Sequence, residues 1–279
     1  MKQLFDEASF VCSKLVTKKY STSFSLAVKM LSPKIREAIF SIYAFVRFAD
    51  EIVDSFHGFE KEKLIDRFEE DYYTAIEEGI SLNPILNAFQ LTVKKYQITD
   101  DLVQAFLKSM KLDLKKETYN TVGEYNDYIY GSADVVGLMC LKVFVAGDNE
   151  KYESLKGAAM SLGSAFQKVN FLRDLKDDYE VLNRSYFPGV NLKSLTFEAK
   201  NEIISEIEND FHEAYKGIKL LPIEAKFGVY TAYIYYRRLL VKLKRTPSEE
   251  IMNTRIRISN PLKISLLAKS FVVFKLNLL

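Results

Sequence analysis

Residues 39–54 read IFSIYAFVRFADEIVD, and residues 166–178 read FQKVNFLRDLKDD. Each stretch carries two aspartates four residues apart, and these are Asp50, Asp54, Asp174 and Asp178. Because residues four apart lie one above the other on a helix, each pair points two carboxylates in the same direction. Like charges at this spacing repel by roughly 0.2–0.5 kcal/mol, so we expect a positive group to compensate them.

Other polar residues share a helical face with each pair. Tyr43 and Arg47 precede the first pair in phase, and Gln167 and Asn170 precede the second, while apolar residues flank both stripes. A polar stripe between apolar flanks is typical of a helix that faces an interior cavity. If the two helices face each other, their aspartates form a set of hard oxygen ligands that suits Mg²⁺ held together with substrate phosphates. A solvated acidic face is the simpler interpretation of one pair, but the duplication within apolar helices argues against it.

The helical period dominates the chain, and strand signals are scarce. The 279 residues include only six prolines and eleven glycines, which leaves room for long helices. Ser32-Pro33 and Thr99-Asp100 are typical helix starts. Breaks are expected at Gly58 and in three segments, residues 79–84, 147–149 and 183–191. These signals predict an all-α bundle of about ten helices. With no linker to mark a boundary, we expect a single domain over residues 1–279.

Composition narrows the class of protein. The net charge is +2, and the basic residues are scattered rather than clustered, so no nucleic-acid partner is expected. The two cysteines, Cys12 and Cys140, have no metal-ligand or redox spacing, which favours a reducing cytoplasm. No apolar run is long enough for a signal peptide or a membrane span. We therefore expect a soluble or peripheral cytoplasmic protein, whose oligomeric state the sequence does not reveal.

The last segment, residues 261–279, interleaves Lys263, Lys269 and Lys275 with many apolar residues. Such a mixture is typical of an amphipathic helix that rests on the inner face of a membrane. A closing helix that packs on the core is the simpler interpretation of the same pattern. Both interpretations stay open at this level.

Four segments, in this order and spacing, resemble the signatures of the squalene and phytoene synthase family. They are YAFVRFADEIVD at 43–54, YGSADVVG at 130–137, QKVNFLRDLKDD at 167–178 and NRSYFP at 183–188. The likeness extends from Ser21 to about Ser259. It implies an all-α isoprenoid synthase fold around a central cavity. It also implies Mg²⁺-dependent head-to-head condensation of two prenyl diphosphates.

The resemblance also implies a role for particular residues. By this resemblance, the residues that bind Mg²⁺, or alternatively Mn²⁺, are Asp50, Asp54, Asn170, Asp174 and Asp178. Diphosphate binding falls to Ser21, Ser23, Arg47, Gln167, Asn170, Arg173 and Arg255. Aromatic positions near the reacting carbons or the diphosphates are Tyr43, Tyr130 and Tyr235. The depth of the cavity is set by residues such as Phe24, Val28, Ala133, Val136, Gly137, Leu138, Leu162 and Ala165.

The expected activity is phytoene synthesis from two geranylgeranyl diphosphates, through a cyclopropyl diphosphate intermediate, in carotenoid biosynthesis. NADPH is not expected, since no GxGxxG follows a strand. A squalene or dehydrosqualene synthase that uses C15 substrates is the alternative, because pocket bulk shifts discrimination by only about 1–3 kcal/mol. A non-catalytic helical assembly protein or membrane-surface protein is the alternative from another class. Asp134 stands where relatives often have Gly or Ala, and its role stays open.

Overall fold

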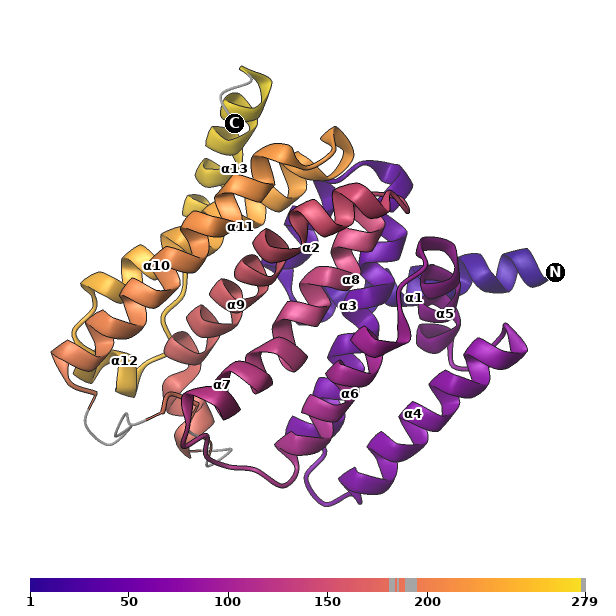
Figure 1. The fold of residues 1–279 in the computed structure, drawn as a ribbon, viewed down its shortest axis with the longest axis horizontal. Helices are drawn as coiled ribbons and strands as arrows, with labels where there is room; N and C mark the ends of the chain where they lie inside the picture. The colour runs from indigo at the N-terminus through magenta and orange to yellow at the C-terminus, as the bar shows by residue number, and fades with distance from the viewer. Residues whose placement is uncertain (181–183, 185, 189–194, 277–279) are drawn as a thin grey trace.

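The computed structural model describes residues 1–180, 184, 186–188 and 195–276, with the backbone alone for residues 177–180. All regular elements in these ranges are helical, which confirms the all-α class (Figure 1). In chain order they are α1 (Lys2–Tyr20), α2 (Thr22–Lys29), α3 (Pro33–Asp54), α4 (Lys61–Glu78), α5 (Pro84–Tyr96), α6 (Asp100–Asp113), α7 (Val122–Ile129), the π-helix η1 (Tyr130–Asp134), α8 (Val135–Phe144), α9 (Asn149–Glu180), α10 (Phe197–Leu220), α11 (Ile223–Arg245), α12 (Ser248–Asn253) and α13 (Asn260–Lys275).

Helix α3 carries the first acidic pair, and aromatic packing fixes its rotation. Phe45 is fully buried, and its ring stacks on Phe89 of α5 with the centroids 3.9 Å apart. On the same side, Phe68 of α4 lies 5.3 Å from it. Because Tyr43 and Arg47 occupy the opposite face of α3, this packing turns them towards the centre of the molecule.

Helix α9 carries the second acidic pair and packs against α10 and α8. The approach of α9 to its neighbours is close at two glycines. A Cβ on Gly163 would lie 2.8 Å from the carbonyl oxygen of Ala133, and one on Gly137 would lie 2.9 Å from the carbonyl oxygen of Ala159. Only glycine fits at such contacts with backbone atoms.

The chain passes from α7 to α8 through the π-helix Tyr130–Asp134. Short π-helical segments occur frequently at functional sites. Here the segment coincides with the YGSADVVG motif, and two of its residues, Ser132 and Ala133, line the cavity described below.

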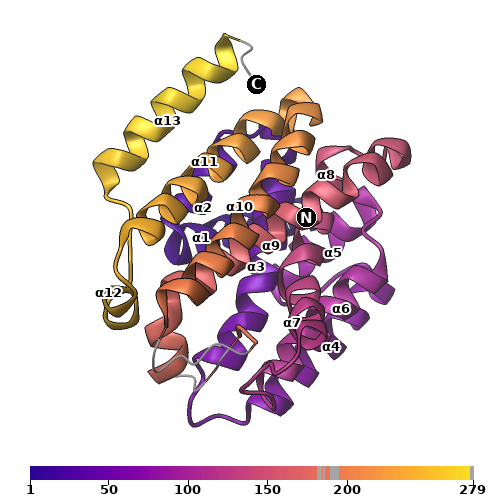
Figure 2. The same cartoon turned by 60° about the vertical axis from the view of Figure 1, so that its left-hand side comes forward.

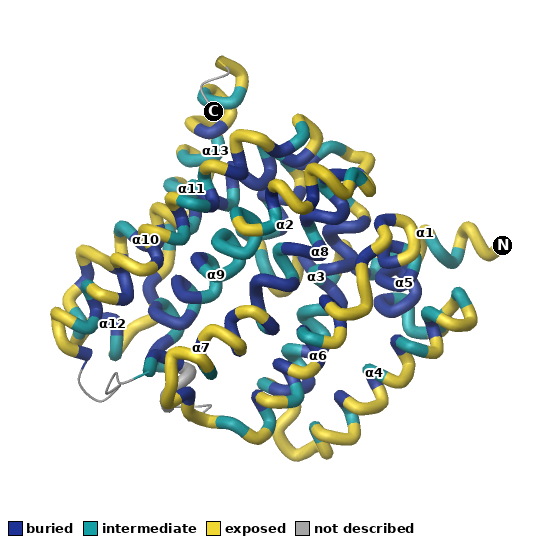
Figure 3. Tube along the Cα trace, in the orientation of Figure 1, coloured by how far each residue is buried: buried dark blue, intermediate teal, exposed yellow. Residues whose placement is uncertain are grey.

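Helix α13 lies along the outside of α11 (Figure 2). The Phe274 ring stacks on Phe227 of α11 with the centroids 5.0 Å apart. The face of α13 that points away from α11 remains exposed, as the yellow and teal tube in Figure 3 shows. This helix thus packs on α11 by one face and presents the other outward. In the part of the chain that the structure describes, no helix combines the length and the apolar character needed to cross a membrane.

Candidate functional site

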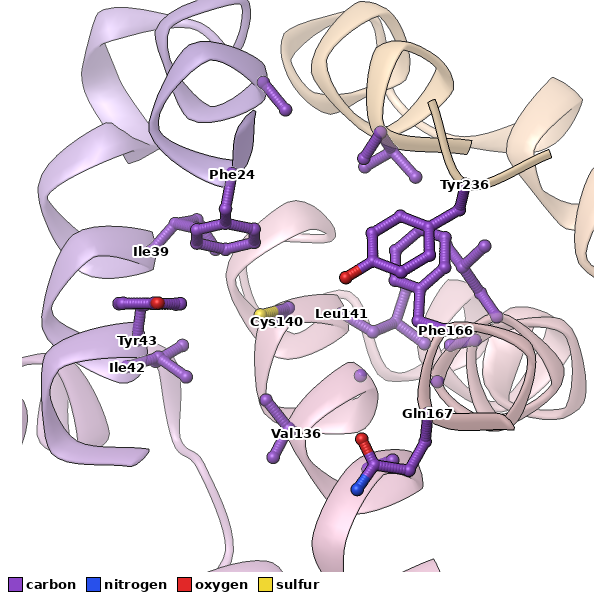
Figure 4. Close-up of a pocket in the computed structure, with 18 of the residues that line it drawn as sticks. Phe24, Ile39, Ile42, Tyr43, Val136, Cys140, Leu141, Phe166, Gln167 and Tyr236 are labelled. Carbon is purple, nitrogen blue, oxygen red and sulfur yellow. The ribbon is translucent and has the colours of Figure 1, made fainter. Parts of the chain in front are cut away.

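A cavity of about 490 Å³ lies between α2 and α3 on one side and α9, α10 and α11 on the other. Figure 4 shows Phe24 and Tyr43 facing Phe166 and Tyr236 across this space, with Cys140 of α8 between them. Most of the lining is apolar or aromatic. Such a cavity suits a long hydrocarbon chain.

Most of the residues expected to set the depth of the cavity do line it. They are Phe24, Val28, Ala133, Val136, Gly137 and Leu162. Leu138 and Ala165 are not among the lining residues. Both are fully buried within the surrounding core instead.

Arginine side chains gather at one end of the cavity. They are Arg47 of α3, Arg173 of α9 and Arg255 of the segment between α12 and α13. Arg47 donates hydrogen bonds to Asp50 and Glu51. Its guanidinium carbon also lies 4.5 Å from the centroid of the Tyr20 ring. Guanidinium groups converging from three elements suit a diphosphate, whose oxygens accept paired hydrogen bonds.

Asp174 is held by two of these arginines. The Nε of Arg173 donates to Oδ1 of Asp174 at 2.9 Å, and the Nε of Arg255 lies 2.8 Å from the same oxygen. The Asp174 side chain remains 18% exposed. A ligand at the arginine end of the cavity, which we call its mouth, can therefore reach it. The side chain of Asp178, the expected second member of this pair, lies outside the described residues.

The first acidic pair shares its two arginines with other carboxylates, since Arg47 also pairs with Glu51 and Arg184 also lies near Asp113. Arg184 donates to Oδ1 of Asp54 at 2.7 Å, which leaves Asp50 with Arg47. Burial and the nearby Asp54 carboxylate together raise the pKa of Asp50 to about 7, against the opposing effect of Arg47. A carboxylate whose charged form is disfavoured in this way is typical of a position that receives a cation.

A buried ion pair next to Asp54 was not anticipated from the sequence. The Nη2 of Arg184 donates to the carbonyl oxygen of Asp113 at 3.0 Å, and its Nη1 lies 3.9 Å from Oδ2 of the same residue. The hydroxyl of Tyr128 donates to that Oδ2 at 2.9 Å. Burial raises the pKa of Asp113 to about 7 although Arg184 opposes it. The NRSYFP motif contains Arg184, whereas no motif marks Asp113.

Two amide side chains lie between the arginines and the apolar interior. Gln167 and Asn170 both line the cavity, in agreement with their shared helical face. The hydroxyl of Tyr236 donates to Oδ1 of Asn170 at 3.3 Å, and Nε2 of Gln167 donates to the Ser132 hydroxyl at 3.4 Å. In Figure 4 the Gln167 amide points into the cavity.

Tyr43 and Ser21 belong to the same wall. The Tyr43 ring stacks on Phe24 with the centroids 4.8 Å apart, and burial raises the pKa of its hydroxyl to about 12. Ser21 lines the cavity and also caps α2, since its side chain accepts a hydrogen bond from the Phe24 amide at 3.2 Å. Ser23 is not among the lining residues.

Tyr235 was expected near the reacting carbons, but it does not line the cavity. The Tyr235 hydroxyl donates to the carbonyl oxygen of Lys263 at 2.9 Å, so it faces α13 and not the cavity. Tyr236 lines the cavity instead, with its ring stacked on Phe166 at 4.0 Å. Consecutive residues point about 100° apart on a helix, so a shift of one residue changes the face. Tyr130 is 36% exposed at the start of η1 and is not a lining residue.

Comparison with known proteins places these features in a family. A family model described as squalene/phytoene synthase matches residues 17–261. The chain belongs to the squalene/phytoene synthase family.

Named members of this family are similar to the chain over most of its length. Phytoene synthase 1 of Solanum lycopersicum is 26% identical over 265 residues, which cover 88% of this chain and 62% of that protein. The phytoene synthase of Arthrospira platensis is 25% identical over 272 residues, which cover 88% of this chain and 87% of that protein. The chain thus spans about 60% of the length of the first three plant phytoene synthases that it resembles, those of Solanum lycopersicum, Daucus carota and Arabidopsis thaliana.

A solved structure shares the fold. The crystal structure of a dehydrosqualene synthase in complex with a ligand superposes with a TM-score of 0.82 at 21% identity. The match covers 97% of this chain and 98% of that one. The helical architecture of squalene/phytoene synthases therefore extends over nearly all of the chain.

The residues present fit the divalent cation expected for this family. Among the side chains that the structure describes, no group of three acidic, histidine or cysteine residues is close enough to hold a metal by itself. Mg²⁺ commonly uses one or two carboxylates together with substrate phosphates and water. Asp50 and Asp54 offer two such carboxylates beside the arginine end of the cavity. Burial, together with the Asp54 carboxylate, raises the pKa of Asp50, and a bound cation would favour its charged form.

Proposed function

We propose that this chain is a phytoene synthase, which joins two geranylgeranyl diphosphates head to head. The observation that carries the proposal is the cavity, whose interior is apolar and whose mouth holds Arg47, Arg173 and Arg255 beside carboxylates of α3 and α9. This arrangement fits a substrate with a diphosphate head and a long apolar tail. Several curated relatives are named phytoene synthase, which supports the C20 substrate.

The head groups bind at the mouth. The three arginines, with the Ser21 hydroxyl and the Gln167 amide, would hold diphosphate oxygens. Mg²⁺ would be held by Asp50, Asp54 and Asp174, by Asp178 from its position in the sequence, and by the amide oxygen of Asn170. When bound, the metal neutralises the charge that grows on the diphosphate as its carbon–oxygen bond breaks.

The apolar and aromatic wall of the cavity surrounds the carbocations that form during the reaction. The bond between carbon and the diphosphate oxygen of one substrate breaks, the double bond of the second attacks the allylic cation, and loss of a proton closes a cyclopropyl ring. The second carbon–oxygen bond then breaks, the ring rearranges, and loss of a second proton leaves a conjugated triene. Ring faces of Phe24, Tyr43 and Phe166 stabilise these cations and exclude water.

Incubation of the purified protein with Mg²⁺ and either farnesyl or geranylgeranyl diphosphate, with and without NADPH, tests this assignment. We expect phytoene from geranylgeranyl diphosphate, in the same amount with and without NADPH. A C30 product from farnesyl diphosphate alone would replace the assignment by dehydrosqualene synthase, or by squalene synthase if the product is reduced. Absence of any product would favour a non-catalytic helical protein.

We also propose that the protein acts in the cytoplasm in peripheral contact with the inner face of a membrane. The exposed face of α13, which carries both lysines and large apolar side chains, supports this proposal. Flotation with lipid vesicles, of the protein with and without residues 261–279, is the direct test. Equal binding by the two forms would contradict the proposal.

A further inference from the structure

The π-helix η1 fits tightly between α6 and α9. The segment from α7 to α8 runs between these two helices in Figure 1, and η1 contacts both of them. A Cβ on Gly131 would lie 2.8 Å from the carbonyl oxygen of Ala105 of α6. On the α9 side, the carbonyl oxygen of Ala133 lies so close to Gly163 that a Cβ there would also be 2.8 Å away. Because both contacts involve backbone atoms, η1 cannot move towards either helix without displacing it.

The π turn determines which face of α8 lines the cavity. The backbone amide of Val135 donates to the carbonyl oxygen of Tyr130, so this turn holds one residue more than an α-helical turn. Consecutive residues of a helix point about 100° apart. If η1 were α-helical, α8 would therefore present to the cavity a face displaced by one residue. With the π turn in place, Val136, Cys140 and Leu141 of α8 line the cavity (Figure 4).

Asp134, the last residue of η1, links the π turn to α9. Its side chain is buried and accepts a hydrogen bond from the Ser164 hydroxyl at 2.7 Å. Ser164 directly follows Gly163, and on the next turn of α9 the Gln167 amide donates to the Ser132 hydroxyl. The bond from Asp134 thus completes a row of contacts between η1 and α9. Asp134 is not among the residues that line the cavity, so it can act on a ligand there only through its neighbours.

A buried lysine near Asp134 already has other partners. Lys168 of α9 donates to Oδ2 of Asp210 at 2.8 Å and pairs with Glu206, and both carboxylates belong to α10. Burial raises the pKa of Asp134 to about 7, against the opposing effects of the Ser164 hydrogen bond and of Lys168. Since two carboxylates of α10 balance the charge of Lys168, Asp134 is not needed for that purpose. Its bond to Ser164 is the contact that needs an explanation.

We propose that Asp134 is a positioning residue, whose hydrogen bond with Ser164 holds the π turn in place, and that the π turn fixes the wall that contacts the hydrocarbon chain of the substrate. The first half stands on the geometry alone, and the second half rests on the proposed function. Ala133 and Val136, on either side of Asp134 in the sequence, are the wall residues through which it acts. A misfit of one methylene in an apolar pocket changes discrimination between substrates by about 10- to 200-fold.

The first half is tested by crystal structures of two variants without ligand. In Asp134→Ala we expect the bond from the Val135 amide to the Tyr130 carbonyl oxygen to be lost and α8 to rotate. Asp134→Asn keeps an acceptor for the Ser164 hydroxyl and should keep the π turn. If Asp134→Ala does not fold, Ser164→Ala removes the same hydrogen bond from the α9 side with a smaller change of side chain. A π turn that persists unchanged without this hydrogen bond would overturn the positioning role.

The second half is tested by calorimetric binding of geranylgeranyl and farnesyl thiodiphosphates in the presence of Mg²⁺. Asp134→Ala and Ser164→Ala should each change the ratio of the two Kd values by at least about fivefold, because the altered wall fits the two chains differently. The double alanine variant should change it no further, since both substitutions remove one interaction. Asp134→Asn should keep the ratio of the wild type. The Kd of inorganic diphosphate should stay the same in all variants, because the arginine mouth is unchanged.

A matched control is a second buried hydroxyl contact between helices. Ser41 of α3 lies 2.7 Å from the Thr92 hydroxyl of α5, and neither residue lines the cavity. Ser41→Ala therefore removes a contact of the same length as that of Ser164, and should leave the Kd ratio as in the wild type.

A wild-type Kd ratio in both single alanine variants would overturn the role of Asp134 in chain recognition. The same change of ratio in Ser41→Ala would also overturn it, because the loss of any buried hydroxyl contact would then suffice. If the wild type binds neither thiodiphosphate, the proposed function fails and chain recognition fails with it. The crystal structures of the variants decide in every case whether Asp134 holds the π turn.

Discussion

At the scale of single residues, the carboxylates at the cavity mouth have the most direct consequence for activity. We expect Asp50→Asn and Asp174→Asn each to lower product formation by at least about a hundredfold, because each removes a ligand charge for the metal. The fold should persist, since Asp50→Asn removes a charge that burial already disfavours. Glu51→Gln is the control, because Glu51 pairs with Arg47 but belongs to no proposed metal site. Near-normal product formation by both asparagine variants would contradict the assignment.

Arg184 is predicted to hold the Asp54 side chain in position and to stabilise the fold. Its side chain is 6% exposed and bonds to Asp54 and to the Asp113 backbone. Arg184→Met should cost about 3–5 kcal/mol of unfolding free energy, measured in urea, because the buried Asp113 loses the cation that balances its charge. Arg184→Met/Asp113→Leu should recover most of that loss. The exposed Arg238→Ala is the control, and a single variant as stable as the wild type would rule out this role.

Raised carboxylate pKa values predict how the stability of the metal-free protein depends on pH. The pKa of Asp50, Asp113 and Asp134 is raised from 3.8 to about 7 in the folded protein, with burial as the first cause in each. The folded state therefore binds these protons more tightly, and the stability that they give is lost as pH rises through about 7. Between pH 6 and 8, deprotonation of each group should lower the free energy of unfolding by about 1 kcal/mol.

Asp134→Asn should reduce that loss, since it imitates the protonated form and its carbonyl oxygen can still accept the Ser164 hydroxyl. Thermal unfolding at pH 6 and 8 measures the effect, with Asp101→Asn on the exposed side of α6 as the control. A wild-type melting temperature that does not fall over this interval would contradict the prediction.

Single residues also mark the limit of what the sequence predicts at the site. The polar stripe on α3 fixes its inward face, so Tyr43 and Arg47 line the cavity as expected. Helix α11 reads YTAYIYYRR over residues 230–238 and offers no comparable stripe. The sequence therefore did not show that Tyr236, and not the expected Tyr235, lines the cavity. Leu138 was misplaced because α8 is apolar around most of its circumference. The contact between Asp113 and Arg184 joins residues 71 positions apart, beyond any local pattern.

At the scale of elements, the close approach of α9 to the end of η1 can be tested by comparing two glycine substitutions on α9. Gly163→Ala would place a Cβ 2.8 Å from the Ala133 carbonyl oxygen, a backbone atom, so we expect it to cost about 1–3 kcal/mol in urea unfolding. Gly157→Ala meets nothing within 4 Å and should raise stability by about 0.5–1 kcal/mol. Equal effects of the two substitutions would show that this contact does not constrain the cavity wall.

Helix boundaries followed local chemistry closely. Proline at the first turn begins α3 after Ser32, Thr99 precedes α6, and Gly79 ends α4 with φ of 75°. The π-helix Tyr130–Asp134 was not foreseen, since its extra residue per turn arises from packing and not from a local signal. The break expected over residues 183–191 falls mostly on positions outside the described part of the chain.

At the scale of the whole molecule, composition and period were sufficient for the all-α class, and the ordered motifs were sufficient for the family. One domain over residues 1–279 stays a prediction, supported by a hydrophobic core that includes residues from α2 to α11. The length of the substrate chain could not be predicted from the sequence, because it depends on the depth of the cavity. That depth is set by the spacing of helices at contacts such as that of Gly228 with Leu31.

The most direct test of the central claim is the anomalous diffraction of Mn²⁺ in crystals soaked with geranylgeranyl thiodiphosphate, whose carbon–sulfur bond resists ionisation. We predict Mn²⁺ at the cavity mouth, bound to Asp50 and Asp54 of α3 and to Asp174 of α9, with the diphosphate beside Arg47 and the tail in the apolar interior. Mn²⁺ bound elsewhere, or a diphosphate held away from these two helices, would contradict it.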